Sequence, residues 1–268
     1  MSCLRSGGAD AAMFEPLRDD APLRRAATQA PGALFRDYCP RSRPHWRMTL
    51  MDAAHLYRSL SQGNRKQINR LHKEHDNVAV TVILDPHQVA ETAGVLETIA
   101  AKTYQRGLGK GFVDCDEHRQ RMLLEAQRGW LRVYVLSVDH TPCAFLTGVV
   151  YREVFHGAFA GYDAAYKQYS PGAFLLYRAL GDLYDHGVTR LDFGYGDAWY
   201  KQRLSDESWE EAPVYIFAPS LDGALLNLRR LCTSAIARGE EALRNRTTVV
   251  ARIKAAWRAR VRKSQAHV

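Results

Sequence analysis

The sequence predicts an α/β domain in which a mixed, mostly antiparallel sheet is flanked by helices. Three strand-like segments follow one another with two-residue links, at residues 130–138, 141–151 and 154–161. Links this short join antiparallel strands, so the three segments predict a meander. The third segment then leads through a helix into another strand at residues 189–193. Such a strand–helix–strand unit makes its two strands parallel, so the sheet as a whole is mixed.

The helix of this unit has a clear start at Ser170 and Pro171 and a clear end at His186 and Gly187. We expect Ser170 to be its N-cap, with the hydroxyl accepting a bond from a backbone N–H, and Pro171 to occupy the first helical position. Apolar side chains then recur at helical spacing, namely Phe174, Tyr177, Leu180, Leu183 and Tyr184. The N–H groups of the first turn and the helix dipole predict a site for a phosphate or another anion.

The chain as a whole divides into a leader, the α/β domain and a tail. Residues 1–47 are rich in Ala, Arg, Pro and Asp without periodicity, and we expect a poorly ordered leader. Residues 48–220 form the predicted domain, and residues 221–268 a basic helical extension. Within the domain the pattern also predicts helices at 51–75, 86–104 and 117–128 and strands at 77–84 and 211–218.

Composition limits the cellular setting. The apolar runs are of strand length, and the N-terminus has no apolar segment typical of a signal peptide. The five cysteines are scattered and include no CxxC pair, which favours reduced thiols over disulfides or zinc. We therefore expect a cytoplasmic protein without a metal.

The positive charge is concentrated in the tail. The net charge is +8, and residues 223–268 carry 11 Lys and Arg against 2 acids, leaving 26 basic and 27 acidic residues elsewhere. A basic helix with one tryptophan has three interpretations: it packs on the domain with its arginines solvated, it lies on an anionic membrane surface, or it binds nucleic acid. The membrane interpretation would make the protein peripheral at the inner membrane face.

Several motifs together carry a family resemblance. The elements GAFAGYD, YSPGAFLLYRAL and LDFGYGDAWYKQRL resemble the GNAT-fold acetyltransferase-like family that includes CelD-type cellulose-biosynthesis proteins and BioF-like domains. These proteins are distant relatives of the Fem-type aminoacyl transferases that modify peptidoglycan. The resemblance covers roughly residues 56–219 and implies the GNAT fold, with acetyl-CoA or another acyl-CoA as a substrate.

The resemblance also suggests where the acyl donor binds. The GNAT pyrophosphate loop corresponds here to a segment that contains the expected cofactor-binding residues Gln168, Ser170, Gly172 and Ala173. Pro171 stands where the family has a glycine and removes one N–H donor. The same corner could instead hold another phosphate or the acceptor, or it could simply be a good helix start.

Candidate catalytic groups follow the second strand of the unit. Asp192 and Asp197 could orient or deprotonate an amine, Tyr200 could donate a proton, and Lys201 could pair with a phosphate or carboxylate. The alternative is that Asp197 caps a short helix and Lys201 is exposed.

Three further residues are expected to bind substrate. Tyr162 and Asp163 follow a strand, where they could line the pocket. Arg65 lies in the basic helix at 51–75, whose charged face is either solvated or in contact with an anionic ligand.

The sequence therefore predicts N-acyl transfer from acyl-CoA to an amine of a small molecule or of a cell-envelope or polysaccharide precursor. One alternative is a Fem-type aminoacyl transferase, for which charged tRNA would be the donor and the basic segments would contact RNA. The other alternative is a GNAT-fold binding protein without catalytic activity.

Overall fold

The computed structural model describes residues 4, 6–29, 32–107, 109, 111–196 and 199–239. They form two compact units. Unit 2 comprises residues 44–208, and unit 1 combines the N-terminal stretch up to residue 43 with the C-terminal stretch from residue 209. No helix in this described part of the chain has the length and apolar character needed to span a membrane.

The sheet of unit 2 is mixed and mostly antiparallel, which confirms the predicted fold class. Its strands lie in the order β2-β7-β6-β5-β4-β3, and every neighbouring pair is antiparallel except β6 and β7. The bounds are β2 Arg43–Thr49, β3 Val78–Ile83, β4 Leu131–Val138, β5 Thr141–Tyr151, β6 Val154–Tyr162 and β7 Arg190–Tyr195.

The predicted meander of β4, β5 and β6 is confirmed, and its turns explain the register. Asp139 and His140, which link β4 to β5, both have positive φ, at 48° and 63°. Two such residues in succession form the mirror-image turn whose twist matches that of a hairpin. Asp and His tolerate this left-handed conformation better than most non-glycine residues.

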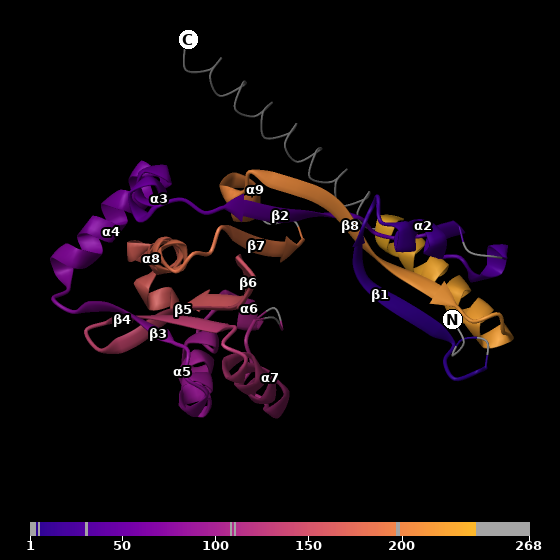
Figure 1. Cartoon of the computed structure of the whole chain (residues 1–268), viewed down its shortest axis with the longest axis horizontal. Coiled ribbons are helices and arrows are strands. Elements are labelled where there is room, and N and C mark those ends of the chain that lie inside the picture. The colour runs from indigo at the N-terminus through magenta and orange to yellow at the C-terminus, as the bar shows by residue number, and fades with distance from the viewer. Residues whose placement is uncertain are drawn as a thin grey trace, which may run out of the picture. The chain divides into compact units, whose positions relative to one another are not determined.

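Helices cover both faces of the meander (Figure 1). The side chains of β4 alternate, so Tyr134 and Leu136 face a core with α3, α4 and α8, whereas Val133 and Val135 face a core with α5 and α7. The helices are α3 Ala53–Ser59, α4 Gln62–Glu74, α5 Val89–Ala100, α6 Tyr104–Gly107, α7 Asp116–Gln127, α8 Pro171–Asp185 and α9 Trp199–Leu204. The 3-10 turns η2 Pro86–Gln88 and η3 Ala164–Tyr169 precede α5 and α8.

The single helix expected at residues 51–75 is in fact two. Asp52 caps α3 by accepting a bond from the His55 N–H, and Ser61 caps α4 by accepting one from the Asn64 N–H. Leu60 between them is extended, at φ −60° and ψ 145°, so the chain leaves the helical conformation at residues 60 and 61. The apolar stripe continues through the break, which is why the periodicity suggested one helix.

The start of α8 differs from the prediction in its capping. Ser170 stands at the N-cap position, but its backbone is left-handed, with φ 51° and ψ 51°, and its side chain makes no capping bond. The Ser170 hydroxyl instead donates to Oε1 of Gln67 on α4. The serine therefore joins α8 to α4, while Pro171 begins the helix as expected.

Unit 1 brings the two ends of the chain together. Strand β1 (Ala11–Arg18) pairs antiparallel with β8 (Glu207–Phe217) through contacts such as Ala11↔Phe217, and α2 (Pro22–Gln29) and η1 (Ala33–Phe35) follow β1. Residues 221–239 are helical. Regular structure thus occurs where the sequence suggested a poorly ordered leader, because β1 gains its stability from pairing with a strand 200 residues away rather than from local pattern. The predicted domain limits of 48 and 220 remain a prediction.

Candidate functional site

Strands β6 and β7 part soon after they pair. Their parallel register covers Val154↔Arg190, Phe155↔Leu191 and His156↔Asp192. Beyond these pairs β6 stays with β5 as far as Tyr162, while β7 stays with β2 as far as Tyr195. A gap therefore opens within the sheet of unit 2.

A cavity of about 570 Å³ lies at this gap. Its size is in the range of small-molecule sites. Backbone of β6 from Gly157 to Tyr162 forms one wall, and Leu191 and Phe193 of β7 contribute to another. Apolar side chains dominate the remaining lining, including Met48, Leu56, Leu175, Leu176, Leu180 and Leu204.

Polar groups enter the cavity at a few defined points. Ser61 and Asn64 come from the start of α4, Gln105 from α6, and Gly172 and Ala173 from the first turn of α8. The N–H groups of a first helical turn have no partner within the helix, so those of Gly172 and Ala173 are available to a ligand. Pro171, one position earlier, offers no N–H.

Glycine at position 172 keeps this corner open. A Cβ added there would lie 3.5 Å from the ring of Tyr162, an ordinary contact distance. A larger side chain would extend from that point into the space beside Tyr162, which itself lines the cavity.

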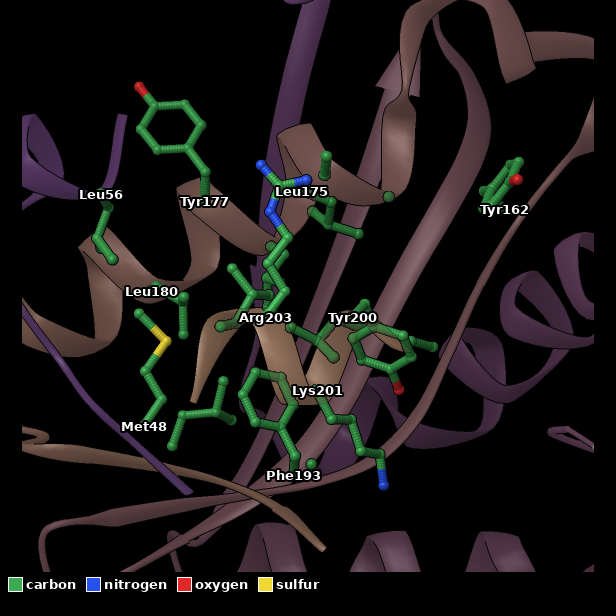
Figure 2. Close-up of a pocket in the computed structure, with 18 of the residues that line it drawn as sticks. Met48, Leu56, Tyr162, Leu175, Tyr177, Leu180, Phe193, Tyr200, Lys201 and Arg203 are labelled. Carbon is green, nitrogen blue, oxygen red and sulfur yellow. The ribbon is translucent and has the colours of Figure 1, made fainter. Parts of the chain in front are cut away.

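Helix α9 supplies the charged side of the cavity. Figure 2 shows Phe193, Tyr200 and Lys201 close together, with Tyr162 apart from them. The rings of Phe193 and Tyr200 meet edge to face, with centroids 6.0 Å apart. Lys201 and Arg203 also line the cavity, and Nζ of Lys201 lies 3.4 Å from the carbonyl oxygen of Tyr195.

The environment of Lys201 shifts its titration. Burial lowers the pKa of the Lys201 ammonium below its ordinary value, and the nearby Asp192 carboxylate acts in the opposite direction. A lysine with a lowered pKa inside a pocket is a typical feature of functional sites.

Asp192 faces away from the cavity. Its neighbours Leu191 and Phe193 line the cavity, and alternate residues of a strand point to opposite faces. The carboxylate is buried and accepts bonds from Nε2 of His45 at 2.6 Å and from the Gly194 N–H at 2.7 Å. Arg47 and His156 lie 3.5 and 3.7 Å from its second oxygen.

This arrangement controls the protonation of Asp192. Burial by itself would raise the pKa of the Asp192 carboxyl, but the bond and the charge of His45, together with Gly194 N–H and His156, outweigh burial and lower the pKa. Asp192 is therefore held as an anion. It influences Lys201 through its charge rather than by contact with a ligand in the cavity.

The predicted site residues are thus distributed unequally around the cavity. Those that line it are Tyr162, Gly172, Ala173, Tyr200 and Lys201. Those that the cavity lining does not include are Arg65, Asp163, Gln168, Ser170 and Asp192. Asp197 lies outside the described residues.

Two of the residues outside the lining have a structural explanation. Asp163 is buried, caps η3 through the Ala165 N–H and pairs with Nζ of Lys102 at 2.9 Å. Arg65 donates to the backbone carbonyl of Arg58 at 3.4 Å, beside the junction of α3 and α4. Among the residues that the structure describes, no three His, Cys, Asp or Glu side chains are grouped so that they could hold a metal ion.

Sequence reasoning also missed several residues of this region. His45 and Arg47 lie in a stretch that was interpreted as leader, and His156 is a single polar residue within an apolar strand. Arg203 belongs to the YKQRL motif and could have been noticed there.

Comparison with known proteins identifies a matching family model. Residues 58–202, more than half of the chain, match the family model described as an acetyltransferase (GNAT) domain. No curated protein matches the chain.

Solved structures share the fold at low sequence identity. A conserved protein of unknown function from Bacteroides thetaiotaomicron is 13% identical, with 79% of this chain and 71% of that chain covered and a TM-score of 0.54. A structure titled FemX is 10% identical, with 82% of this chain and 74% of that chain covered and a TM-score of 0.52. At such identities the likeness concerns the fold.

Proposed function

Because the chain belongs to the acetyltransferase (GNAT) domain family, we propose that it transfers an acyl group from an acyl-CoA to an amine. The family membership confirms the resemblance noted in the sequence, and it establishes a GNAT-type acyltransferase domain. The proposal adds the reaction: the acceptor is an amine of a small molecule or of a cell-envelope or polysaccharide precursor.

The cavity between β6 and β7 is the observation that carries this proposal. In an acyl-CoA the thioester lies at the end of a narrow, flexible arm. Such an arm fits an apolar channel, and the polar groups along the arm need backbone N–H or C=O groups of the protein as hydrogen-bond partners. The β6 wall supplies such groups, since β7 has moved away from it; one of them, the Ala160 carbonyl, already accepts a bond from Nε2 of Gln105 at 3.4 Å. The apolar lining excludes water and so strengthens every polar contact with the reacting carbonyl.

The first turn of α8 supports binding of the donor's phosphates. Gly172 and Ala173 would offer two N–H groups at the positive end of a 15-residue helix. A loop with another residue in place of Pro171 would offer one backbone N–H donor more. Of the four expected cofactor-binding residues, the proposal therefore assigns the contact to these two, because the Ser170 hydroxyl is engaged by Gln67 and Gln168 is exposed.

The chemistry requires two proton movements. The amine nitrogen attacks the thioester carbonyl, a C–N bond forms and the C–S bond breaks, and the proton that the nitrogen loses replaces the one that the leaving thiolate takes up, so that no net proton is released. We assign Lys201 and Tyr200 to the carbonyl oxygen and the leaving group, because both line the cavity and both carry a proton. Asp192 is assigned a positioning role, since its negative charge favours the protonated form of Lys201 without lining the cavity.

A second candidate function has one observation in its favour. Pro171 weakens the corner that would bind a pyrophosphate, whereas an aminoacyl ester has no pyrophosphate to bind. In transfer of an aminoacyl group from charged tRNA to an amine, a C–N bond again forms, but the bond that breaks is the ester C–O bond, and a ribose hydroxyl leaves. This candidate predicts binding of tRNA and no binding of acyl-CoA.

Calorimetry and thermal melting with acetyl-CoA and longer acyl-CoAs test the proposal. A ligand present at about 100 times its dissociation constant adds roughly 2.7 kcal/mol of stability, which a melting curve resolves. We expect saturable binding that Gly172→Asp weakens, since a carboxylate at the second position of α8 repels the phosphates.

Gly63→Asp is the matched control. Like Gly172, Gly63 is the second residue of its helix; it is exposed, and a Cβ added there would lie 3.9 Å from Oγ of Ser61. An aspartate in a first turn favours both helices equally, so only the binding should differ. Failure of every thioester to bind contradicts the proposal; binding of charged tRNA in that case supports the second candidate, and binding of neither supports a non-catalytic role.

A further inference from the structure

The helix at residues 221–239 belongs to unit 1, and contacts at its start determine which of its faces is turned toward that unit. It begins at Ser220, whose Oγ accepts a bond from the Gly223 N–H at 3.1 Å. Gly223 is required at this point, because a Cβ there would lie 2.3 Å from the carbonyl oxygen of Ala218. The start of the helix therefore fixes which of its faces points toward the rest of unit 1.

The face that points inward is polar. Asn227 is 3% exposed, and its Nδ2 donates to the carbonyl oxygens of Leu34 and Arg36, both at 2.8 Å. One turn further, Arg230 pairs with the buried Asp37 at 3.0 Å and stacks on the ring of Tyr215 at 3.9 Å. Further along, Ser234 is buried too. Directed hydrogen bonds and an ion pair hold this face, so the helix cannot rotate without breaking them.

The face that points outward is apolar. Its side chains recur at helical spacing and stand in the solvent: Leu221 is 85% exposed, Leu225 55%, Leu228 56% and Ile236 63%. Cys232 continues the same stripe and is exposed as well. An amphipathic helix normally buries its apolar stripe and solvates its polar one. Here the order is reversed, and a contiguous apolar row on a surface marks an interaction site.

Charge identifies the partner. Beside the stripe the exposed Asp222 and Arg229 offset each other, and the positive charge lies in residues 240–268, whose sequence contains 8 Lys and Arg against 2 acids. A second copy of this chain would bring the same positive charge against itself. An anionic lipid surface offers both an apolar layer for the leucines and a negative potential for the basic residues.

We propose that the Leu221–Ile236 stripe is a docking face for an anionic membrane surface, with the helix lying in the plane of the headgroups. The apolar side chains enter the interface, while the exposed Arg229 beside them contacts lipid phosphates. The role is independent of the reaction proposed above, because the stripe belongs to unit 1 and the cavity to unit 2.

Co-sedimentation of the full chain with lipid vesicles tests this proposal. One vesicle type is pure phosphatidylcholine, and the other contains about 30% phosphatidylglycerol, close to the anionic content that attracts basic segments. The key variant is Leu225→Gln with Leu228→Gln, which removes two exposed apolar side chains without changing charge. The control is Leu123→Gln with Leu124→Gln on α7, where leucines are exposed to a similar degree, at 39% and 53%.

The expected result is binding to the anionic vesicles, loss of about tenfold in affinity for the Leu225/Leu228 variant and no loss for the control. Part of the binding should persist at about 0.5 M salt, where charge attraction is screened to a few Å. Circular dichroism and melting curves establish that both variants fold.

Three outcomes would overturn the proposal. The first is absence of binding to anionic vesicles. The second is equal binding by the wild type and the Leu225/Leu228 variant, since the basic stretch alone would then account for it. The third is a wild-type dimer, or a complex with RNA, that the same variant dissociates while vesicle binding stays unchanged.

Discussion

Replacement of Asp192 by asparagine tests whether this buried carboxylate organises the region behind the cavity. The side chain is 7% exposed and accepts bonds from His45 Nε2 at 2.6 Å and Gly194 N–H at 2.7 Å, with Arg47 at 3.5 Å. Asparagine keeps the shape of aspartate and can still accept one of these bonds. It removes the negative charge on β7 with which His45 and Arg47 of β2 and His156 of β6 interact.

The size of the effect follows from the hydrogen bonds. A bond to a charged group contributes about 1.5–3 kcal/mol and a neutral one about 1 kcal/mol. Two bonds lose their charged acceptor in Asp192→Asn, so we expect the free energy of unfolding to fall by about 2 kcal/mol. For a domain of about 150–250 residues this corresponds to a decrease of roughly 4–8 °C in melting temperature.

The pH dependence gives a second, independent readout. The folded-state pKa of Asp192 lies below its ordinary value of 3.8, because the interactions with His45 outweigh burial. A carboxylate with a lowered folded-state pKa contributes its full stability above the unfolded-state pKa and loses it as the pH falls through the folded-state pKa. The difference between the wild type and Asp192→Asn should therefore be constant near neutral pH and narrow below about pH 4.

Thermal melting monitored by circular dichroism between neutral and acid pH measures both quantities. Asp20→Asn is the control, because Asp20 is 75% exposed and pairs with Arg18 at the surface, where such pairs contribute little. Equal melting temperatures for the wild type and Asp192→Asn at pH 7 would refute the reasoning. A difference that persists unchanged at acid pH would show that the effect is one of packing and not of charge.

Three further predictions concern the cavity. Lys201→Met should lower kcat/KM for acyl transfer by about 100-fold while acyl-CoA binding is retained, since the ammonium is assigned to the reacting groups; unchanged turnover contradicts the assignment. Ser61→Ala should destabilise the chain by about 1 kcal/mol in urea titrations, because the Asn64 N–H loses its cap at 3.1 Å. Gly161→Ala should cost about 1–3 kcal/mol, because its Cβ would lie 2.9 Å from the ring of Phe145; a neutral result would mean that the ring moves aside.

Much of unit 2 could be predicted from local pattern. The three meander strands are rich in β-branched and aromatic residues and are joined by two-residue links, so their type, order and direction follow from short-range rules. Helix α8 has a proline at its first position and a regular apolar repeat, and its predicted bounds agree with the observed Pro171–Asp185. In these elements the propensities of the residues, the turn or capping residues and the pattern of buried apolar side chains all predict the same structure.

Strand β1 could not be predicted in this way, and strand β2 was missed. Strand β1 contains Pro16, and its register with β8 shifts between Phe14 and Leu17, so the proline sits in an irregularity that only the pairing reveals. Strand β2, RPHWRMT, is polar because His45 and Arg47 interact with the Asp192 carboxylate. These polar residues alternate with Pro44, Trp46 and Met48, so β2 carries the period-2 signal of a strand, which the interpretation of residues 1–47 as a leader passed over. In β1, by contrast, a long-range pairing replaces the alternation of apolar and polar residues that marks an ordinary strand.

For the candidate site, too, the sequence predicts a segment but not its arrangement in space. The block from Asp192 to Lys201 was predicted because a strand end with glycines, aromatics and charges is typical of a site, and Phe193, Tyr200 and Lys201 of this block line the cavity. The block alone does not reveal which side of β7 opens into the cavity. That depends on where β6 departs from β7, after His156↔Asp192, a property of two strands separated by a helix.

The departure of β6 from β7 also separates the residues of the Asp192–Lys201 block into those that face the cavity and those that face the other side of the sheet. Leu191 and Phe193 face the cavity, and the residue between them turns its charge toward β2 and β6. Lys201 then returns from α9 to the cavity side, within electrostatic reach of that charge. A charge on the far face of the sheet thus acts on a cation on the near face without contact with the substrate. Asp192→Asn and Lys201→Met should consequently differ in kind: the first affects stability and the titration of Lys201, the second the turnover itself.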